Sequence, residues 1–263
     1  MKYTLITGAS NGLGKEMAKY CADLGHNLLL ISLPNENLET ISKQLANDFN
    51  IKTDFFEIDL TKDHSARNIH SWAIERNYKV NFLINNAGFG GVGAFEDYDF
   101  NYINLMLNLN VKATTNLTHF FLPELKKNTP SNLLNIASMI ANFHCPYKSI
   151  YASSKVYIKY FTRALRVELK PYNINVSLLQ PGAIPTNKVA IEQMKNGGFF
   201  ARVSAASPEE VAKKAINKTL AKQAVIVPGW KNRLSLLILK IIPNNLREKL
   251  GLISTKSMLK NMN

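Results

Sequence analysis

The sequence is poor in residues that define several other classes of protein. Among 263 residues there are two cysteines, Cys21 and Cys145, which cannot form a disulfide framework and lack metal-ligand spacing. The five histidines show no pairing that indicates a metal, so we predict no metal site. Both cysteines are interpreted as buried thiols in a reducing compartment. This favours a cytoplasmic protein.

Long apolar runs and acidic residues are also scarce. No run approaches the roughly 20 residues that span a bilayer. Lys2 to Thr7 lead straight into a glycine-rich segment, so we expect no signal peptide. Nineteen acidic residues face 32 basic ones, a net charge of +13. This excess indicates an anionic partner, a membrane surface or simply solubility. No aromatic-interleaved basic patch or known recognition motif is present, so we predict no nucleic-acid partner.

The sequence does contain a regular alternation of short β-rich runs and longer amphipathic stretches. This pattern predicts an α/β fold, a Rossmann-like, doubly wound parallel sheet of about seven strands with helices on both faces. We expect one domain over 1–230 and an irregular loop over 181–206. The predicted strands are 3–6, 28–32, 53–58, 80–84, 132–136, 175–179 and 225–227. The predicted helices are 13–24, 38–49, 66–75, 102–121, 152–170 and 208–222.

A glycine-rich loop, residues 7–14 (TGASNGLG), follows the first strand and opens the first helix. Glycines at 8, 12 and 14 allow a sharp turn and a close approach of backbone N–H groups to a pyrophosphate. The positive end of the following helix would face the phosphates. The loop therefore predicts a dinucleotide site, and an ordinary tight turn is the alternative.

Further motifs stand at residues 85–88 (NNAG), 151–155 (YASSK) and 181–182 (PG), with Thr186 beyond the last. In this order and spacing, over roughly residues 1–230, the chain resembles the short-chain dehydrogenase/reductase family. The tail is most similar to acyl and steroid ketoreductases with extended C-termini. The resemblance implies a hydride transfer between a nicotinamide and an alcohol or ketone. It also implies a homo-oligomer, a dimer or tetramer, formed through helices 102–121 and 152–170.

The resemblance implies a cofactor site spread over several strand ends. Its expected members are Gly8, Ser10, Asn11, Gly12, Leu13, Gly14, Ser32, Asp59, Leu60, Asn86, Ala87, Gly88, Tyr151, Lys155, Pro181, Gly182, Ile184 and Thr186. Asp59 could equally cap the next helix near Thr61. Ser32-Leu33 ends the second strand without the acid that selects NAD and without the arginine frequent in NADP enzymes. Because Ser32 can donate to a phosphate, we favour NADP(H) and leave NAD(H) open.

Tyr151 and Lys155 are one helical turn apart, on one face. A free phenol has a pKa near 10, and a neighbouring ammonium stabilises its phenolate. We therefore expect Tyr151 to be the acid/base and Lys155 to tune it and hold the nicotinamide ribose. Ser138 would donate to the substrate oxygen, or else cap a turn. By resemblance, Asn110 would bend its helix and hold a relay water. The full set argues against a non-catalytic nucleotide-binding sensor or scaffold.

Two regions bear on the substrate and partners. Residues 139–147 and 187–206 are rich in apolar side chains, which favours a hydrophobic carbonyl or alcohol, although these residues could equally be packing. The extension 231–263 carries seven basic residues and one acid, and seven of the nine residues 234–242 are apolar. Two interpretations of 231–250 stay open. It packs on the domain or a second subunit, or it contacts a membrane surface or lipid-like substrate.

Overall fold

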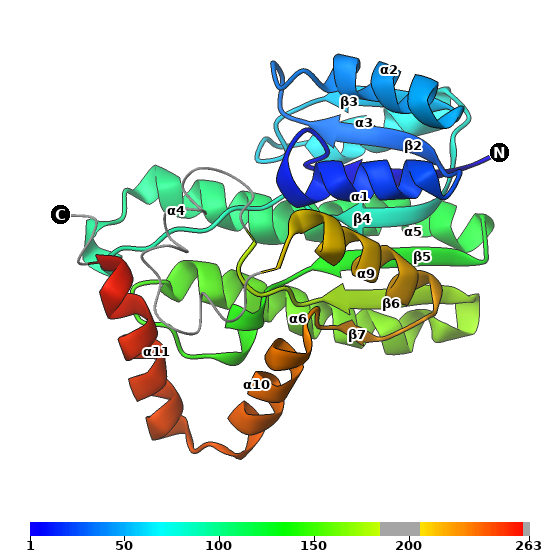
Figure 1. Ribbon diagram of the computed structural model, residues 1–263. Helices are drawn as coiled ribbons and strands as arrows, with labels where there is room; N and C mark the ends of the chain where they lie inside the picture. Colours follow the sequence, from blue (N-terminus) through cyan, green and yellow to red (C-terminus); the bar gives the residue numbers. More distant parts are fainter. Residues whose placement is uncertain (185–205, 260–263) are drawn as a thin grey trace.

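The computed structural model describes residues 1–184 and 206–259, and within them a single parallel sheet organises the chain (Figure 1). Its strands follow the order β3-β2-β1-β4-β5-β6-β7. The order reverses between β1 and β4, which places a crevice at the carboxyl ends of these two strands. The bounds are β1 Lys2–Thr7, β2 Asn27–Ser32, β3 Thr53–Glu57, β4 Lys79–Asn85, β5 Ser131–Ile136, β6 Ile174–Leu179 and β7 Val225–Ile226.

Helices cover both faces of this sheet, and each face has its own apolar core. One layer holds α1 Gly12–Asp23, α2 Leu38–Phe49 and α9 Pro208–Leu220, and the other holds α3 Ser65–Glu75, α5 Thr114–Lys127 and α6 Ser149–Leu169. Because neither face meets water, the central strands are apolar without alternation, as in Leu28–Ile31, which is fully buried. The predicted doubly wound fold is confirmed.

The helix predicted over 102–121 is interrupted. The chain forms α4 Phe100–Leu107, a π-helical segment Asn108–Ala113, and then α5. Within that segment, the buried Asn110 side chain accepts from the Phe89 N–H (3.0 Å) and donates to the Phe89 carbonyl (2.8 Å). A widened turn at a point that binds another backbone is typical of functional sites. The bend expected at Asn110 therefore takes the form of a π-helical turn.

A buried polar chain joins the two central strands β4 and β5. Asn85 and Asn135 face each other in register, and the Asn85 amide donates to Asn135 Oδ1 (2.9 Å) and to Thr118 Oγ1 (3.0 Å). The Asn135 amide in turn donates to Thr162 Oγ1 on α6 (3.0 Å). These side chains are buried, and their hydrogen bonds replace those that water would make, except at Asn85 Oδ1, which is buried without a hydrogen-bond partner.

The C-terminal extension forms two helices, α10 Trp230–Ile241 and α11 Asn244–Leu259. In Figure 1, α10 descends from the β7 edge and α11 returns toward the body, so the pair forms a V below the sheet. Across the described part of the chain, no helix is both long enough and apolar enough to cross a membrane.

Candidate active site

The glycine-rich loop makes a close turn at the end of β1. Gly8 and Gly12 have positive φ angles of 66° and 52°, a conformation that glycine adopts without strain. A Cβ at Gly14 would lie only 2.0 Å from the Gly8 carbonyl oxygen, so the first turn of α1 and the loop touch backbone to backbone. This geometry fits the approach of a pyrophosphate to the N-terminus of α1.

Thr7 and Asn86 fasten this loop to the neighbouring strand β4. The Thr7 hydroxyl accepts from the backbone N–H groups of Asn86 (2.9 Å) and Ala87 (3.0 Å). The Asn86 side chain donates to the Thr7 carbonyl (2.9 Å) and the Gly8 carbonyl (3.4 Å). Asn86 therefore shapes the phosphate loop, a role that sequence analysis did not assign to it, and Thr7 was not singled out at all.

The other loop residues divide between packing and an open hollow. Leu13 is buried in the core of the α1 face, whereas Asn11 caps α1 through its side chain (2.7 Å to the Gly12 N–H). Ser10 donates a hydrogen bond to the Glu36 carboxylate. Ser10, Asn11, Lys15, Glu36, Asn37, Thr40, Ile41 and Gln44 line a hollow of about 430 Å³ at this end of the sheet. Glu36 and Lys15, one acid and one base, were both missed because they lie outside the motifs.

The residues expected at the ends of β2 and β3 are mostly engaged locally. Ser32 is buried and its hydroxyl donates to the Leu33 carbonyl (3.1 Å), not toward the hollow. Asp59 accepts from the Thr61 N–H (2.9 Å) and hydroxyl (2.7 Å), and Leu60 packs in the core. Asp59 caps that short turn. It does not cap α3, which begins at Ser65 instead of near Thr61.

Gly88, Asn110 and Lys155 meet beyond the end of β4. A Cβ at Gly88 would lie 2.9 Å from Asn110 Oδ1 and 3.2 Å from Lys155 Nζ. The Asn110 amide also donates to Ser154 Oγ (3.0 Å), and Lys155 Nζ donates to the Ile136 carbonyl (3.1 Å). Gly88 thus lies close to both the Asn110 amide and the Lys155 ammonium, which come from segments far apart in sequence.

Tyr151 and Ser138 lie on the same side of this cluster. The Tyr151 ring centroid is 5.9 Å from Lys155 Nζ, and a side-chain hydrogen bond links Tyr151 to Ser138. Ser138 Oγ also accepts from the Ile140 N–H (3.3 Å) as the cap of a 3-10 turn, η3 Met139–Asn142. Ser138 therefore caps the turn, one of the two roles expected for it, and its donation to a substrate oxygen stays a prediction.

Burial governs the charges in the cluster. It raises the pKa of Tyr151 above its usual value, with a smaller opposing effect from the Ser138 hydrogen bond. It lowers the pKa of Lys155 to about 8. The lowered Tyr151 pKa expected from Lys155 is therefore not observed. Lys155 Nζ is directed to the Ile136 carbonyl, and desolvation disfavours the phenolate.

The segment after β6 completes one side of the crevice. The Pro181 carbonyl accepts from the Met139 N–H (2.9 Å), which ties this turn to η3, and Ile184 packs against the core of the α1 face. Gly182 lies between them in the same turn. Thr186, most of the loop expected over 181–206 and the apolar residues of 187–205 lie outside the described residues.

Gly90 is a further residue that sequence analysis missed. A Cβ there would lie 2.9–3.0 Å from three carbons of the Tyr151 ring, so the glycine backbone forms a wall against that ring. The signal was present in the motif, because Phe89-Gly90-Gly91 directly continues the 85–88 segment. Only the fold reveals which side chain the glycine accommodates.

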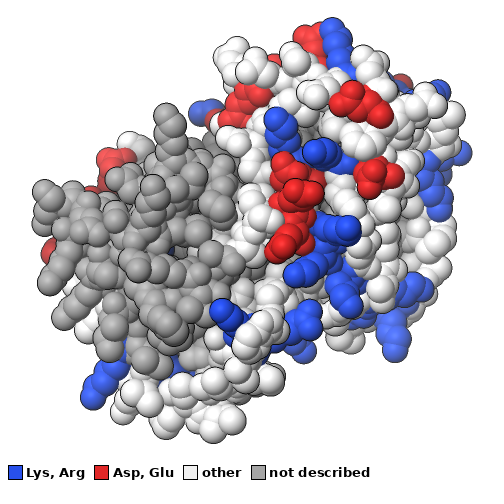
Figure 2. Space-filling model, in the orientation of Figure 1, with Lys and Arg blue, Asp and Glu red and all other residues white. Residues whose placement is uncertain are grey.

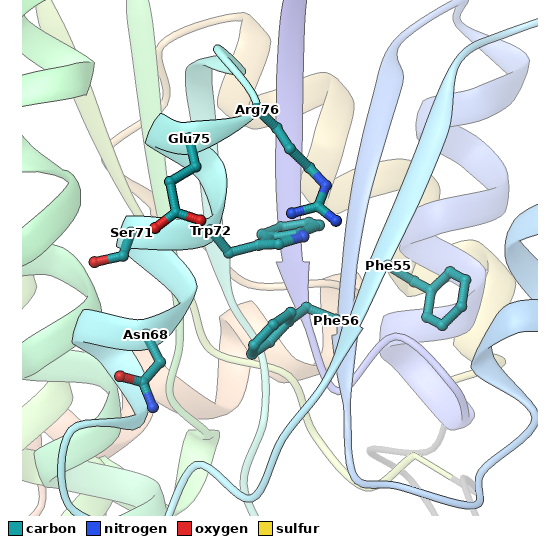
Figure 3. Close-up of a pocket in the computed structure, with 7 residues that line it drawn as sticks. All are labelled: Phe55, Phe56, Asn68, Ser71, Trp72, Glu75 and Arg76. Carbon is teal, nitrogen blue, oxygen red and sulfur yellow. The ribbon is translucent and has the colours of Figure 1, made fainter.

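A second hollow, of about 420 Å³, lies between β3 and α3 (Figure 3). The Arg76 guanidinium lies over the Trp72 ring (5.7 Å to its centroid), with Phe56 packed on the same indole (5.3 Å). None of the predicted site residues lines it.

Comparison with known proteins identifies the class. The family model described as short chain dehydrogenase matches residues 2–196. The chain belongs to the short-chain dehydrogenase family, which confirms the resemblance and the enzyme class predicted from the motifs.

Individual relatives are more distant. The chain is 29% identical to hydroxysteroid dehydrogenase-like protein 1 of Gallus gallus, over 92% of this chain and 72% of that protein. It is 31% identical to 3-ketodihydrosphingosine reductase of Bacteroides thetaiotaomicron, over 69% of this chain and 64% of that protein. A short-chain dehydrogenase of Sphingobium yanoikuyae in complex with NADPH superposes with a TM-score of 0.78 at 24% identity, covering 90% of this chain and 92% of that one.

Proposed function

We propose that this protein reduces the carbonyl group of a hydrophobic substrate with NADPH, and that Tyr151 is the proton donor. The observation that carries this proposal is the convergence of Asn110, Ser138, Tyr151 and Lys155 at one end of the sheet. When bound, the nicotinamide supplies the hydride. A non-catalytic nucleotide-binding protein of the same fold would not need this set of four side chains.

The charges of the site favour the reductive direction. Tyr151 is partly buried, and desolvation raises its pKa, so the phenol holds its proton at neutral pH and is ready to deliver it from Oη to a carbonyl oxygen. The Ser138 hydroxyl, already beside Tyr151, would hold that oxygen in place. Lys155, with its pKa near 8, would be largely protonated at neutral pH and would bind the ribose of the cofactor.

The residues around the loop fit a nicotinamide dinucleotide. Gly8, Gly12 and Gly14 would leave backbone N–H groups for the pyrophosphate, and Gly88 would bring the chain close to the ribose side. NADP(H) is favoured because Ser32 occupies the position where an acidic residue would select NAD, and because Lys15 adds a positive charge to the hollow. Solved structures of similar fold that hold NADPH or NADP support this choice. Glu36 in the same hollow is the argument for NAD(H).

A hydrophobic substrate is favoured by the apolar segment around Met139 and by the names of several relatives. These relatives include a very-long-chain 3-oxoacyl-CoA reductase of Danio rerio and the 3-ketodihydrosphingosine reductase. The Danio rerio reductase is 26% identical to this chain, over 73% of this chain and 61% of that protein. Long acyl chains and steroids share a carbonyl on a large apolar body, so we propose that substrate class.

The test compares two tyrosines of one helix. NADPH and NADH oxidation should be followed with a long-chain 3-oxoacyl thioester, a ketosteroid and a small ketone. Tyr151→Phe should lower turnover about 10²–10⁴-fold, the usual contribution of a general acid. Tyr157→Phe, on the exposed side of α6 and bonded to Thr115, should stay near wild type. Equal loss in both variants, or activity only with the small ketone, would contradict the proposal.

We also propose that the protein forms a homo-oligomer through the helical layer of α4, α5 and α6. Large apolar side chains lie exposed on two of these helices: Phe100, Leu105, Leu107, Tyr160 and Val167. Their exposure on helices that are otherwise packed favours burial against a second copy. Light scattering at micromolar concentration should give at least a dimer, and Val167→Lys should weaken it. A monomer would contradict this part.

A further inference from the structure

The helix α10 has one face turned to the protein and one turned away. On the inner face Leu239 is buried against the body, and the buried Asn232 amide donates to the Pro228 carbonyl (2.8 Å). The outer face carries residues at helical spacing that are exposed to 48–85%: Trp230, Leu234, Leu237, Ile238 and Ile241. We call these five residues the α10 stripe. The helix is therefore docked, yet it leaves a continuous apolar surface uncovered.

The stripe lies on a part of the molecule that projects from the sheet. In Figure 1 the V formed by α10 and α11 extends below the body, with its tip at the turn after Ile241. Ile241 at that tip is 85% exposed. The far arm is fixed at Gly251, whose missing side chain lets α11 touch the His144 carbonyl. A projecting V with an apolar tip can reach a planar surface that the rest of the protein does not touch.

The sequence around the stripe is strongly basic. Residues 231–263 carry seven basic side chains and one acid, Glu248, which faces His144 (3.7 Å). Lys231 lies beside the Trp230 ring (5.9 Å), and Lys249 is exposed on α11. Figure 2 shows this lower region as a mostly uncharged surface with Lys and Arg at its edges. Apolar area edged with cations is the composition of an interfacial helix.

We propose that the α10 stripe binds the surface of an anionic lipid bilayer, with α10 lying in the headgroup region and its cations on the lipid phosphates. Charge decides between this occupant and a second copy of the chain. Two copies joined at this face would bring two segments of net +6 together, whereas an anionic surface neutralises them. The apolar side chains on α4 and α6 offer a second copy a different surface.

Trp230 supplies a built-in probe for this proposal. The chain has two tryptophans, and Trp72 is buried (6% exposed) whereas Trp230 is 71% exposed. Full-length protein should be mixed with vesicles of phosphatidylcholine alone, or of phosphatidylcholine with phosphatidylglycerol, at low and high salt. We expect co-sedimentation with the anionic vesicles, weaker at high salt, together with a blue shift of Trp230 emission. Brominated lipids should quench that emission, and Trp230→Phe should abolish the quenching.

Two matched variants test whether the stripe itself makes the contact. The double substitution L237S/I241S should lower vesicle affinity at least about tenfold, because two large side chains no longer leave water. Ile74→Ser removes an exposed apolar side chain (42%) from α3, away from both the stripe and the proposed subunit interface, and should change affinity by about twofold or less. Thermal unfolding should confirm that both variants fold.

Three results would overturn the proposal. The first is no binding to anionic vesicles at low salt. The second is binding without any change in Trp230 emission, and the third is an equal loss of vesicle affinity in both variants. Light scattering without lipid tests the alternative that a second copy of the chain covers the stripe. If L237S/I241S splits a wild-type dimer, a second copy covers the stripe and the membrane assignment is wrong.

Discussion

The glycine-rich loop after β1 and the C-terminal V both depend on a glycine that touches a backbone oxygen. A Cβ at Gly14 would lie 2.0 Å from the Gly8 carbonyl, and one at Gly251 would lie 1.9 Å from the His144 carbonyl. Around Gly14, core packing and the hydrogen bonds of Thr7 and Asn86 fix every neighbouring element. Around Gly251, the two helices leave apolar side chains outside. The same local contact thus lies within a packed region in one case and beside an exposed apolar surface in the other.

Gly14→Ala should have the largest effect, because the contact it breaks lies inside the packed region. The new methyl group must push apart the loop and α1, which costs about 3 kcal/mol of the free energy of unfolding. The displaced loop should also weaken NADPH binding about 100-fold or more. Fluorescence titration and thermal unfolding measure the two effects. Unchanged cofactor affinity would show that this loop does not carry the phosphates.

Lys155→Met tests the cost of the buried ammonium. Folding lowers the pKa of Lys155 from 10.5 to about 8, so the unfolded chain holds more protons between these pH values. The free energy of unfolding of the wild-type protein should therefore rise between pH 8 and 10.5, as the cost of burying the Lys155 ammonium is relieved. At pH 7 the variant should be more stable by about 1–3 kcal/mol, and the gain should shrink as the pH rises through that window.

The same variant should lose turnover and bind NADPH more weakly. Denaturant unfolding at several pH values, beside an activity assay, measures both effects. A variant that is less stable at pH 7 would show that the hydrogen bond to the Ile136 carbonyl outweighs desolvation.

Lys15 and Glu36 should give smaller, opposite effects on cofactor choice. Glu36→Gln removes a negative charge from the hollow and should raise the preference for NADPH over NADH about fivefold, as expected for a charge near water. Lys15→Gln should lower it by a similar factor. Lys43→Gln, whose side chain pairs with Glu39 on the surface, is the matched control. Parallel titrations with both cofactors provide the measurement, and two shifts of the same sign would refute the assignment.

Gly251→Ala should have the smallest effect on global stability, within about 1 kcal/mol, because α11 can move without opening either core. Limited proteolysis should nevertheless cut the 242–259 segment faster than in wild type. If the unfolding temperature falls as far as in Gly14→Ala, the V belongs to the cooperative core and the contrast between the regions fails.

Local patterns sufficed for the elements and motifs, because glycines at 8, 12 and 14 and a tyrosine–lysine pair impose their geometry within a few residues. The π-helical turn at Asn110 could not be predicted from its own helix, since its partner is the backbone of Phe89. Glu36 and Gly90 were missed for a related reason. Each acts through a contact, with Ser10 or with the Tyr151 ring, that only the folded chain creates. For α10, the composition did not indicate which face packs on the body and which face stays exposed to solvent.

The buried pair Asn85–Asn135 has a consequence for the register in which β4 and β5 pair. Runs of leucine and isoleucine slide past one another at little cost, because any shift of two residues still places apolar side chains together. A slip of either strand would separate Asn85 from Asn135 and leave amides unpaired inside the protein, at about 1–3 kcal/mol for each group. The pair therefore disfavours any other register of β4 against β5. This pairing favours the register in which β4 and β5, followed by Asn86 and by Ser138, end at the same edge of the sheet.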